Sequence, residues 1–282
     1  MPGVSLLLVH AHPDDETITC GGLMALATGA GVPVTLVTFN RGELGEVIPP
    51  GLRHLTGDAL GEYREGELAR ACAALGVTDH RWLGGDGTGV GPWHDSGMVL
   101  AGAGIRAAAP ATIDDGAFAA PGAFGAQVEA LVAVLRDVDP TVVITYDEGG
   151  GYGHPDHVRA HEITKAAVAV MSGVPARLLY AVVGRVTLDA GLADLRATPF
   201  RMPVPDELPS VPDAAVTTRL DVRSGHARRI AAMRAHATQL VVAPDERSFA
   251  MSNGVAQPVL PVEEYIAVDG RRGADLFADV DG

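Results

Sequence analysis

Two apolar runs of this chain each end in a polar turn that leads into a helical pattern. Residues 4–9 and 141–145 are almost continuously apolar or β-branched, which is typical of strands buried on both faces of a parallel sheet. The stretches that follow the turns, 23–27 and 158–171, have the composition of helices. Because the carboxyl ends of parallel strands meet at one edge of a sheet, both turns should lie at the edge where open α/β sheets bind ligands.

The rest of the chain adds strands and helices to this plan. Residues 33–39 form another β-rich run, and this strand–helix–strand order predicts a parallel sheet with a right-handed crossover. Five prolines make 198–213 an irregular surface segment. The remaining expected elements are strands at 81–84, 178–183 and 216–222 and helices at 63–75, 127–137 and 224–238, the last opened by a Ser cap at Ser224.

These elements predict an α/β protein with a Rossmann-like, mostly parallel sheet flanked by helices. We assign residues 1–185 to this catalytic core and 186–282 to a small C-terminal α+β cap that forms a pocket wall and does not fold independently. Within the core, residues 85–125 are rich in Gly, Ala and Pro and predict an irregular insertion or lid. We expect 93–98 to be an ordered pocket wall and 101–123 to be mobile.

Composition and charge exclude several classes of partner. The chain has 282 residues, of which 47% are hydrophobic, and its net charge is −14, so a nucleic-acid or anionic-membrane surface is not expected. Its two cysteines, Cys20 and Cys72, are too few for a disulfide framework or a Cys-rich zinc site. No apolar run approaches the roughly 20 residues of a membrane helix. The N-terminus lacks the basic segment of a signal peptide, so we expect a cytoplasmic location.

The two polar turns carry side chains of the kinds that bind divalent metals. Imidazole and carboxylate donors with one open coordination position are typical of catalytic zinc and related metal sites. The candidates are His12, Asp14 and Asp15 in the first turn and His154, Asp156 and His157 in the second.

Two other interpretations of the first turn are weaker. Its acidic residues could merely complement the positive end of a helix, but this leaves His12 and Pro13 unexplained. A dinucleotide-binding fold begins with the same strand–helix–strand order, but its Gly-x-Gly-x-x-Gly turn is absent here. Carboxylates in its place would repel a pyrophosphate.

The turns and several further motifs resemble the LmbE-like N-acetylglucosaminyl deacetylase superfamily. Within it, the chain is similar to the mycothiol-pathway deacetylases of actinobacteria over most of its length. The motifs that carry the resemblance are AHPDDE at 11–16, HPDH at 154–157, GELGEVI at 42–48, YR at 63–64, WHDSGM at 93–98 and MRAHATQ at 233–239.

The resemblance implies a role for each candidate residue. It implies one Zn²⁺ per chain, with Fe²⁺ possible in the cell, and Asp14 as a general base beside the metal. Tyr152 would stabilise the oxyanion, and His154 would act as a charged stabiliser or acid held by Asp156. The implied metal ligands are His12, Asp15 and His157, and the implied substrate contacts are Arg64, Asp95, Glu46, Met98 and Gln239.

The activity implied by the resemblance is hydrolysis of the N-acetyl group of an amidosugar-inositol, GlcNAc-Ins, to GlcN-Ins and acetate. A mycothiol S-conjugate amidase or an antibiotic-glycoside N-deacetylase of the same superfamily is the alternative enzyme, and a metal-free sugar-binding module is the alternative outside enzymes. Gly153 and the 93–98 motif favour the deacetylase, and the amidase branch usually carries proline at position 153.

Overall fold

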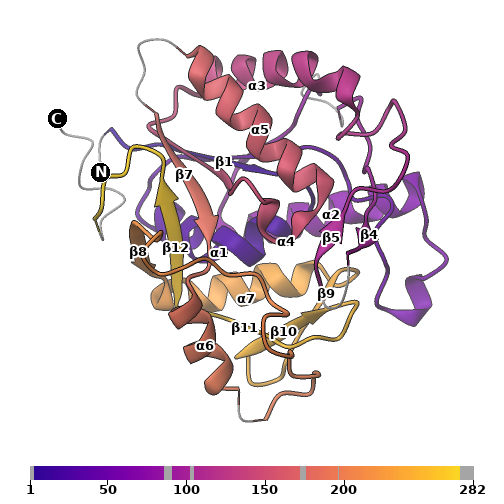
Figure 1. The fold of residues 1–282 in the computed structure, drawn as a ribbon, viewed down its shortest axis with the longest axis vertical. Coiled ribbons are helices and arrows are strands. Elements are labelled where there is room, and N and C mark those ends of the chain that lie inside the picture. The colour runs from indigo at the N-terminus through magenta and orange to yellow at the C-terminus, as the bar shows by residue number, and fades with distance from the viewer. Residues whose placement is uncertain (1–2, 86–90, 102–104, 172–175, 196, 274–282) are drawn as a thin grey trace.

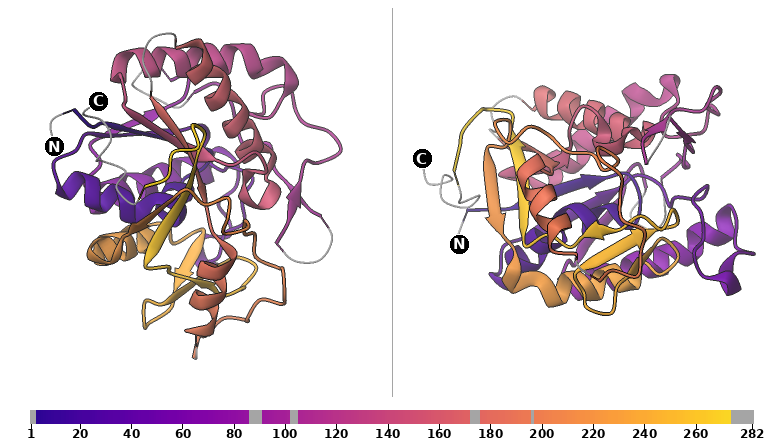
Figure 2. Two further views of the ribbon diagram at one scale, coloured as in Figure 1. Left: turned by 60° about the vertical axis from the view of Figure 1, so that its left-hand side comes forward. Right: turned by 60° about the horizontal axis from the view of Figure 1, so that its bottom comes forward.

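A seven-stranded sheet runs through the centre of the protein, with helices on both faces (Figures 1 and 2). The computed structural model describes residues 3–85, 91–101, 105–171, 176–195 and 197–273. The strands, in their order across the sheet, are β3 (Asp79–Trp82), β2 (Val34–Thr38), β1 (Leu6–His10), β6 (Val142–Tyr146), β7 (Arg177–Val182), β12 (Val262–Ala267) and β8 (Thr218–Asp221).

The two faces of the sheet bury two separate cores. Strands β1, β2 and β6 are buried at every position, which explains their continuous apolar character. Along β1, Leu6 and Leu8 face one core, whereas Leu7 and Val9 face the other. The helices of the first core are α1 (Asp15–Gly29), α2 (Asp58–Leu75) and α7 (His226–Ala235), and those of the second are α3 (Phe124–Val138) and α5 (Pro155–Val170).

The sheet is mostly parallel, as predicted. Strands β3, β2, β1, β6 and β7 pair in parallel, and β12 pairs antiparallel with both β7 and β8. Two strands expected in a C-terminal cap, β8 and β12, therefore extend the central sheet, and that part of the prediction is wrong. Outside the sheet lie helix α6 (Arg185–Ala193), which we did not predict, and a small sheet of β9 (Leu240–Val242), β10 (Ser248–Met251) and β11 (Gln257–Pro258).

The helix expected at 224–238 differs at both ends. A 3₁₀ turn, η3 (Arg223–Gly225), precedes α7, so Ser224 is not its cap, and the residue before α7, Gly225, makes no side-chain cap. Helix α7 ends at Ala235, and the next residues form a turn closed by the N–H of Gln239 donating to the carbonyl of His236 at 3.0 Å.

The insertion contains short regular pieces. Strands β4 (Val99–Leu100) and β5 (Ala107–Ala108) form a hairpin, and the 3₁₀ turn η2 (Pro121–Ala123) leads into α3; a further 3₁₀ turn, η1 (Pro50–Leu52), precedes α2. Phe118 is fully buried and stacks on Phe39 with ring centroids 4.3 Å apart. The described part of the segment that we expected to be mobile thus packs into the core at Phe118, while 102–104 lie outside the described residues. No helix in the described ranges is long and apolar enough to cross a membrane.

Candidate metal centre and active site

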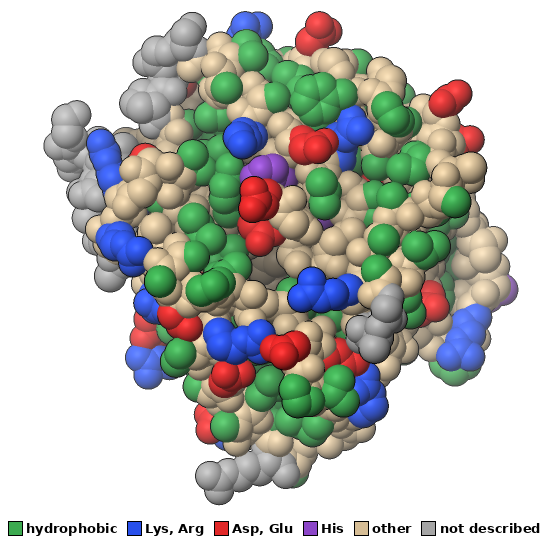
Figure 3. Space-filling model, in the orientation of Figure 1, with side chains coloured by type: hydrophobic (Ala, Val, Ile, Leu, Met, Phe, Trp, Pro, Cys, Tyr) green, Lys and Arg blue, Asp and Glu red, His purple; other side chains and the backbone are tan. Residues whose placement is uncertain are grey.

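The two polar turns meet at the carboxyl edge of the sheet, as the sequence predicted. Strands β1 and β6 are neighbours in parallel register, with Leu8 opposite Ile144. The first turn follows β1 directly, and the second follows β6 through the short helix α4 (Gly150–Gly153). In the space-filling view of Figure 3, a histidine side chain lies beside acidic side chains, near a hollow in the centre of the visible face of the molecule.

Three donor atoms from the turns form a nearly equilateral triangle. The distance from His12 Nδ1 to Asp15 Oδ2 is 3.3 Å, that from Asp15 Oδ2 to His157 Nε2 is 3.2 Å, and that from His157 Nε2 to His12 Nδ1 is 3.3 Å. A tetrahedral zinc site with ligand bonds of about 2.0–2.1 Å has edges of roughly 3.3 Å. The spacing of the three atoms therefore fits a zinc-sized ion, and all three residues are buried.

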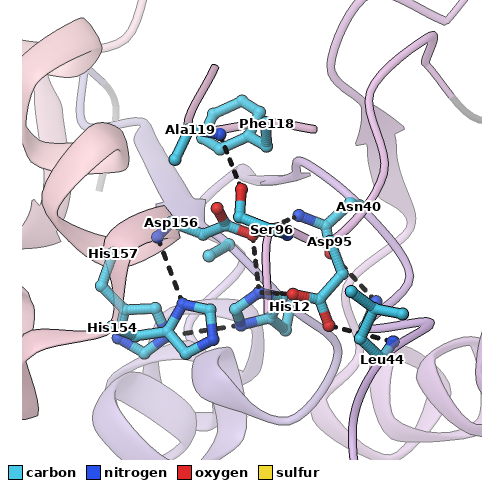
Figure 4. A network of polar contacts seen from close by, with 12 residues as sticks. His12, Asn40, Leu44, Asp95, Ser96, Phe118, Ala119, His154, Asp156 and His157 are labelled. Carbon is cyan, nitrogen blue, oxygen red and sulfur yellow. Dashed lines mark hydrogen bonds and ion pairs between the residues drawn. The ribbon is translucent and has the colours of Figure 1, made fainter. Parts of the chain in front are cut away.

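The other ring nitrogen of His12 is held by Asp156 (Figure 4). His12 Nε2 lies 3.2 Å from Asp156 Oδ2, which also accepts from Asn40 Nδ2 at 2.9 Å and from the Ser96 N–H at 3.2 Å. Although burial acts in the opposite direction, the hydrogen bond from His12 lowers the pKa of Asp156 to about 2. A carboxylate that orients a metal-binding imidazole in this way is a common partner of such sites.

This contact corrects one predicted role. We expected the Asp156 side chain to hold His154, but it holds His12, and His154 Nδ1 instead accepts from the backbone N–H of Asp156 at 3.2 Å. The reason is local: His154 is the N-cap of α5, so its ring turns back onto the first turn of its own helix.

Tyr146 supports the third donor and was missed by the sequence analysis. Its hydroxyl donates to Asp15 Oδ2 at 2.7 Å and accepts from the Ala11 N–H at 2.9 Å, and its ring stacks on His157 with centroids 4.2 Å apart. Asn40 was missed as well. Tyr146 is the last residue of β6, and Asn40 follows the end of β2 at the same edge of the sheet. Their position in the sequence, at the end of a buried strand, is the signal by which both could have been predicted.

Asp14 lies beside the triangle but is not one of its donors. Its Oδ2 is buried and has no hydrogen-bond partner among the described residues. Burial and the neighbouring Asp15 carboxylate raise the pKa of Asp14 well above its usual range. Its backbone has φ 103° and ψ −33°, an unusual conformation for a non-glycine residue. A buried carboxylate with a free oxygen and a raised pKa has the properties of a general base.

Tyr152 and His154 pack against the two histidines of the triangle. The Tyr152 ring packs edge-on against His157 at 5.1 Å, and burial raises its pKa well above 10, so the hydroxyl keeps its proton. His154 packs on His12 at 4.6 Å, and burial together with His12 and His157 lowers its pKa to about 2. This direction of the shift favours the neutral imidazole, and the role of His154 as a charged stabiliser or acid stays a prediction.

The predicted substrate contacts fall into two groups. Asp95 is buried, with Oδ1 3.9 Å from His12 Nε2, whereas Glu46 and Met98 are exposed. Arg64 and Gln239 are buried and have partners within the protein. The Arg64 guanidinium donates to the Gly42 carbonyl, to the Glu46 carbonyl at 3.1 Å and to Thr238 Oγ1 at 3.3 Å. Gln239 Nε2 donates to the Pro13 carbonyl at 2.6 Å.

A Rossmann-like sheet with converging imidazole and carboxylate donors beside a free carboxylate defines a candidate metal-dependent hydrolase. The chain belongs to the GlcNAc-PI de-N-acetylase family, whose model matches residues 7–168. It is 50% identical to the 1D-myo-inositol 2-acetamido-2-deoxy-α-D-glucopyranoside deacetylase of Actinosynnema mirum, over 98% of this chain and 97% of that protein. It is 49% identical to the protein of the same name from Saccharomonospora viridis, over 96% and 97%.

A solved structure supports the fold. The 4-carboxy-2-hydroxymuconate hydratase of Pseudomonas putida KT2440 matches with a TM-score of 0.57 at 18% identity, covering 97% of this chain and 99% of that one. Because hydration of a muconate differs from hydrolysis of an amide, this likeness concerns the fold alone.

Proposed function

We propose that this protein hydrolyses the N-acetyl amide of GlcNAc-Ins, releasing acetate and the free amine GlcN-Ins. The proposal rests on near-full-length relatives that carry this activity in their names and are about half identical to the chain. The site supports it, because amide hydrolysis needs an activated water, a donor to the oxyanion and a proton for the leaving amine.

We further propose that His12, Asp15 and His157 hold one zinc ion, on the strength of their spacing. When bound, zinc lowers the pKa of a coordinated water from 15.7 to about 7 and polarises the substrate carbonyl. Iron(II) accepts the same kinds of donor and is the alternative occupant in the cell.

The protein's own groups move the protons. Asp14 would take one proton from the attacking water as the new C–O bond forms, and would deliver that proton to the amide nitrogen as the C–N bond breaks. Tyr152, which keeps its hydroxyl proton, would donate to the carbonyl oxygen while negative charge develops there. His154 would stand beside the leaving group as a stabiliser or acid. The balance is one water and one amide consumed, one acetate and one amine formed.

For the sugar-inositol end, we propose contacts from Asp95, whose Oδ1 lies 3.9 Å from His12 Nε2, and from the exposed Glu46 and Met98. Asp95→Asn should then lower kcat/KM more with GlcNAc-Ins than with plain GlcNAc. Equal losses on both substrates would give Asp95 a structural role. Arg64 and Gln239 stay candidate contacts, and their buried hydrogen bonds also support a role in shaping the pocket.

Gly153 supports the deacetylase over the amidase. Its φ of 96° lies outside the range that a proline ring allows, and a Cβ at this position would come 2.5 Å from the Ala107 carbonyl oxygen. The deciding experiment compares acetate release from GlcNAc-Ins with cleavage of a mycothiol S-conjugate. Faster cleavage of the conjugate would overturn the proposal, and an absence of acetate release from metal-loaded protein would indicate a binding module.

A further inference from the structure

The peptide group between Pro13 and Asp14 is held at both of its polar atoms. Its N–H, which belongs to Asp14, donates to Glu16 Oε2 at 2.9 Å. Its carbonyl, which belongs to Pro13, accepts from Gln239 Nε2 at 2.6 Å. All of these residues are buried. A peptide plane fixed at both ends cannot rotate, so it sets the direction in which the Asp14 side chain leaves the backbone.

Asp14 needs such support. Its φ of 103° is the only positive φ of a non-glycine residue among the described residues of the two polar turns. Backbone in a sparsely populated region persists only where the surroundings over-determine it, and such residues cluster at active sites. The hydrogen bond that Glu16 accepts and the one that Gln239 donates supply that constraint.

The constraint originates in a turn at the other end of the chain. Glu16 Oε1 accepts from His236 Nε2 at 2.8 Å, and both side chains are fully buried. His236 and Gln239 belong to one turn, whose Thr238 docks on the Glu67 carboxylate of α2 with bonds of 2.9 and 2.5 Å. The turn thus contacts the Pro13 carbonyl directly through Gln239, and it reaches the Asp14 N–H indirectly through Glu16.

We propose that the turn formed by residues 236–239 is a positioning element for Asp14, acting through Glu16 and the Pro13 carbonyl. This inference rests on the proposed function, in which Asp14 is the general base. None of these hydrogen bonds involves an atom of the donor triangle. Asp15 Oδ2 has its contacts with His12, His157 and Tyr146 instead. Loosening the turn should therefore misdirect the base and leave metal binding intact.

The first test replaces Gln239 by Met, which keeps the length of the side chain and removes the donor. We expect kcat for acetate release to fall about 10- to 100-fold, the effect of a misplacement near 1 Å. KM and metal content should stay near the wild-type values. Gln127→Met is the matched control, because Gln127 is also buried and its Nε2 donates to a backbone carbonyl, that of Phe118, at the same distance of 2.6 Å.

A second pair of variants tests the arm through Glu16. His236→Leu removes the donor, whereas His236→Gln places an amide N–H near the position of Nε2. We expect the Leu variant to lose activity as Gln239→Met does, and the Gln variant to recover part of it. Equal activity of the two His236 variants would overturn the role of this hydrogen bond.

A double-mutant cycle separates this inference from the proposed function. If the turn acts through Asp14, Gln239→Met should cause no further loss in an Asp14→Asn background. A full additional loss in that background would overturn the positioning role while leaving Asp14 as the base. A higher KM at unchanged kcat in Gln239→Met would make Gln239 a substrate contact instead. Near-normal activity of Asp14→Asn alone would overturn the proposed base.

Discussion

Replacing Tyr146 by Phe isolates the hydroxyl that holds Asp15. The Phe ring can still stack on His157, but the hydrogen bonds to Asp15 Oδ2 (2.7 Å) and from the Ala11 N–H (2.9 Å) are lost. A buried N–H left without a partner costs about 1–3 kcal/mol of unfolding free energy. For a chain of 282 residues this corresponds to a decrease in Tm of about 2–5 °C.

The same change should weaken metal binding. Asp15 would lose the group that fixes its carboxylate, and loss of such a partner typically reduces metal affinity by roughly 10- to 100-fold. Zinc affinity measured by competition with a chelator, together with calorimetric Tm of the metal-free protein, checks both effects. Tyr180→Phe is the control, because no hydrogen bond of the Tyr180 hydroxyl occurs among the described residues. A zinc affinity of Tyr146→Phe equal to that of the control would refute this role for the hydroxyl.

Three further predictions follow from the site and its surroundings. His157→Ala removes one corner of the donor triangle, so metal content after purification should fall well below one equivalent; a full equivalent would show that other donors hold the metal. Asp14→Asn should keep its metal and lose about 10²–10⁴ in kcat, and a near-normal rate would assign the base to another group. Burial lowers the pKa of His80 from 6.5 to about 4, so the unfolded chain binds more protons between these values and stability falls as pH falls. Urea unfolding of the metal-free protein should show a loss of about 2 kcal/mol from this group between pH 7 and pH 5. His80→Gln should abolish that loss, and the exposed His54→Gln should not.

The meeting of the two polar turns could be predicted because it depends on local pattern and one topological rule. Residues 4–9 and 141–145 read as strands buried on both faces, and parallel neighbours bring their carboxyl ends together. The identity of the side-chain partners could not be predicted in this way. Asp156 holds His12 rather than His154, because the ring of His154 caps its own helix, and such local geometry leaves no mark in the sequence spacing.

Long-range strand pairing accounts for the other differences between the predicted and the observed secondary structure. Strand β12 lies between β7 and β8 in the central sheet, although it is separated from β7 by about 80 residues of irregular chain and short elements. A short amphipathic run near the end of a chain has the same local pattern whether it joins a central sheet or a peripheral one. Helix α6 has nine residues, which is less than the window of about 11 residues over which helical periodicity can be recognised.

The C-terminal part of the chain adds hydrogen bonds to the backbone of α1. Arg229 donates to the carbonyls of Thr17 (3.3 Å) and Ile18 (2.6 Å), and Glu263 accepts from the N–H groups of Gly22 (2.7 Å) and Leu23 (2.9 Å).

Arg229 and Glu263, which are opposite in charge, thus hydrogen-bond to the backbone of α1 although they lie more than 200 residues later in the sequence. The two side chains approach each other to 3.7 Å. A Cβ on Gly22 would come 2.4 Å from Val222 Cβ and 2.8 Å from Glu263 Oε1, so a glycine is needed where these side chains approach the helix. Helix α1 begins at Asp15, the proposed metal ligand, and its first turn carries Glu16. The family match ends at residue 168, yet the groups that fix the start of α1 lie beyond that residue. The geometry of the candidate catalytic turn is therefore a property of the whole chain.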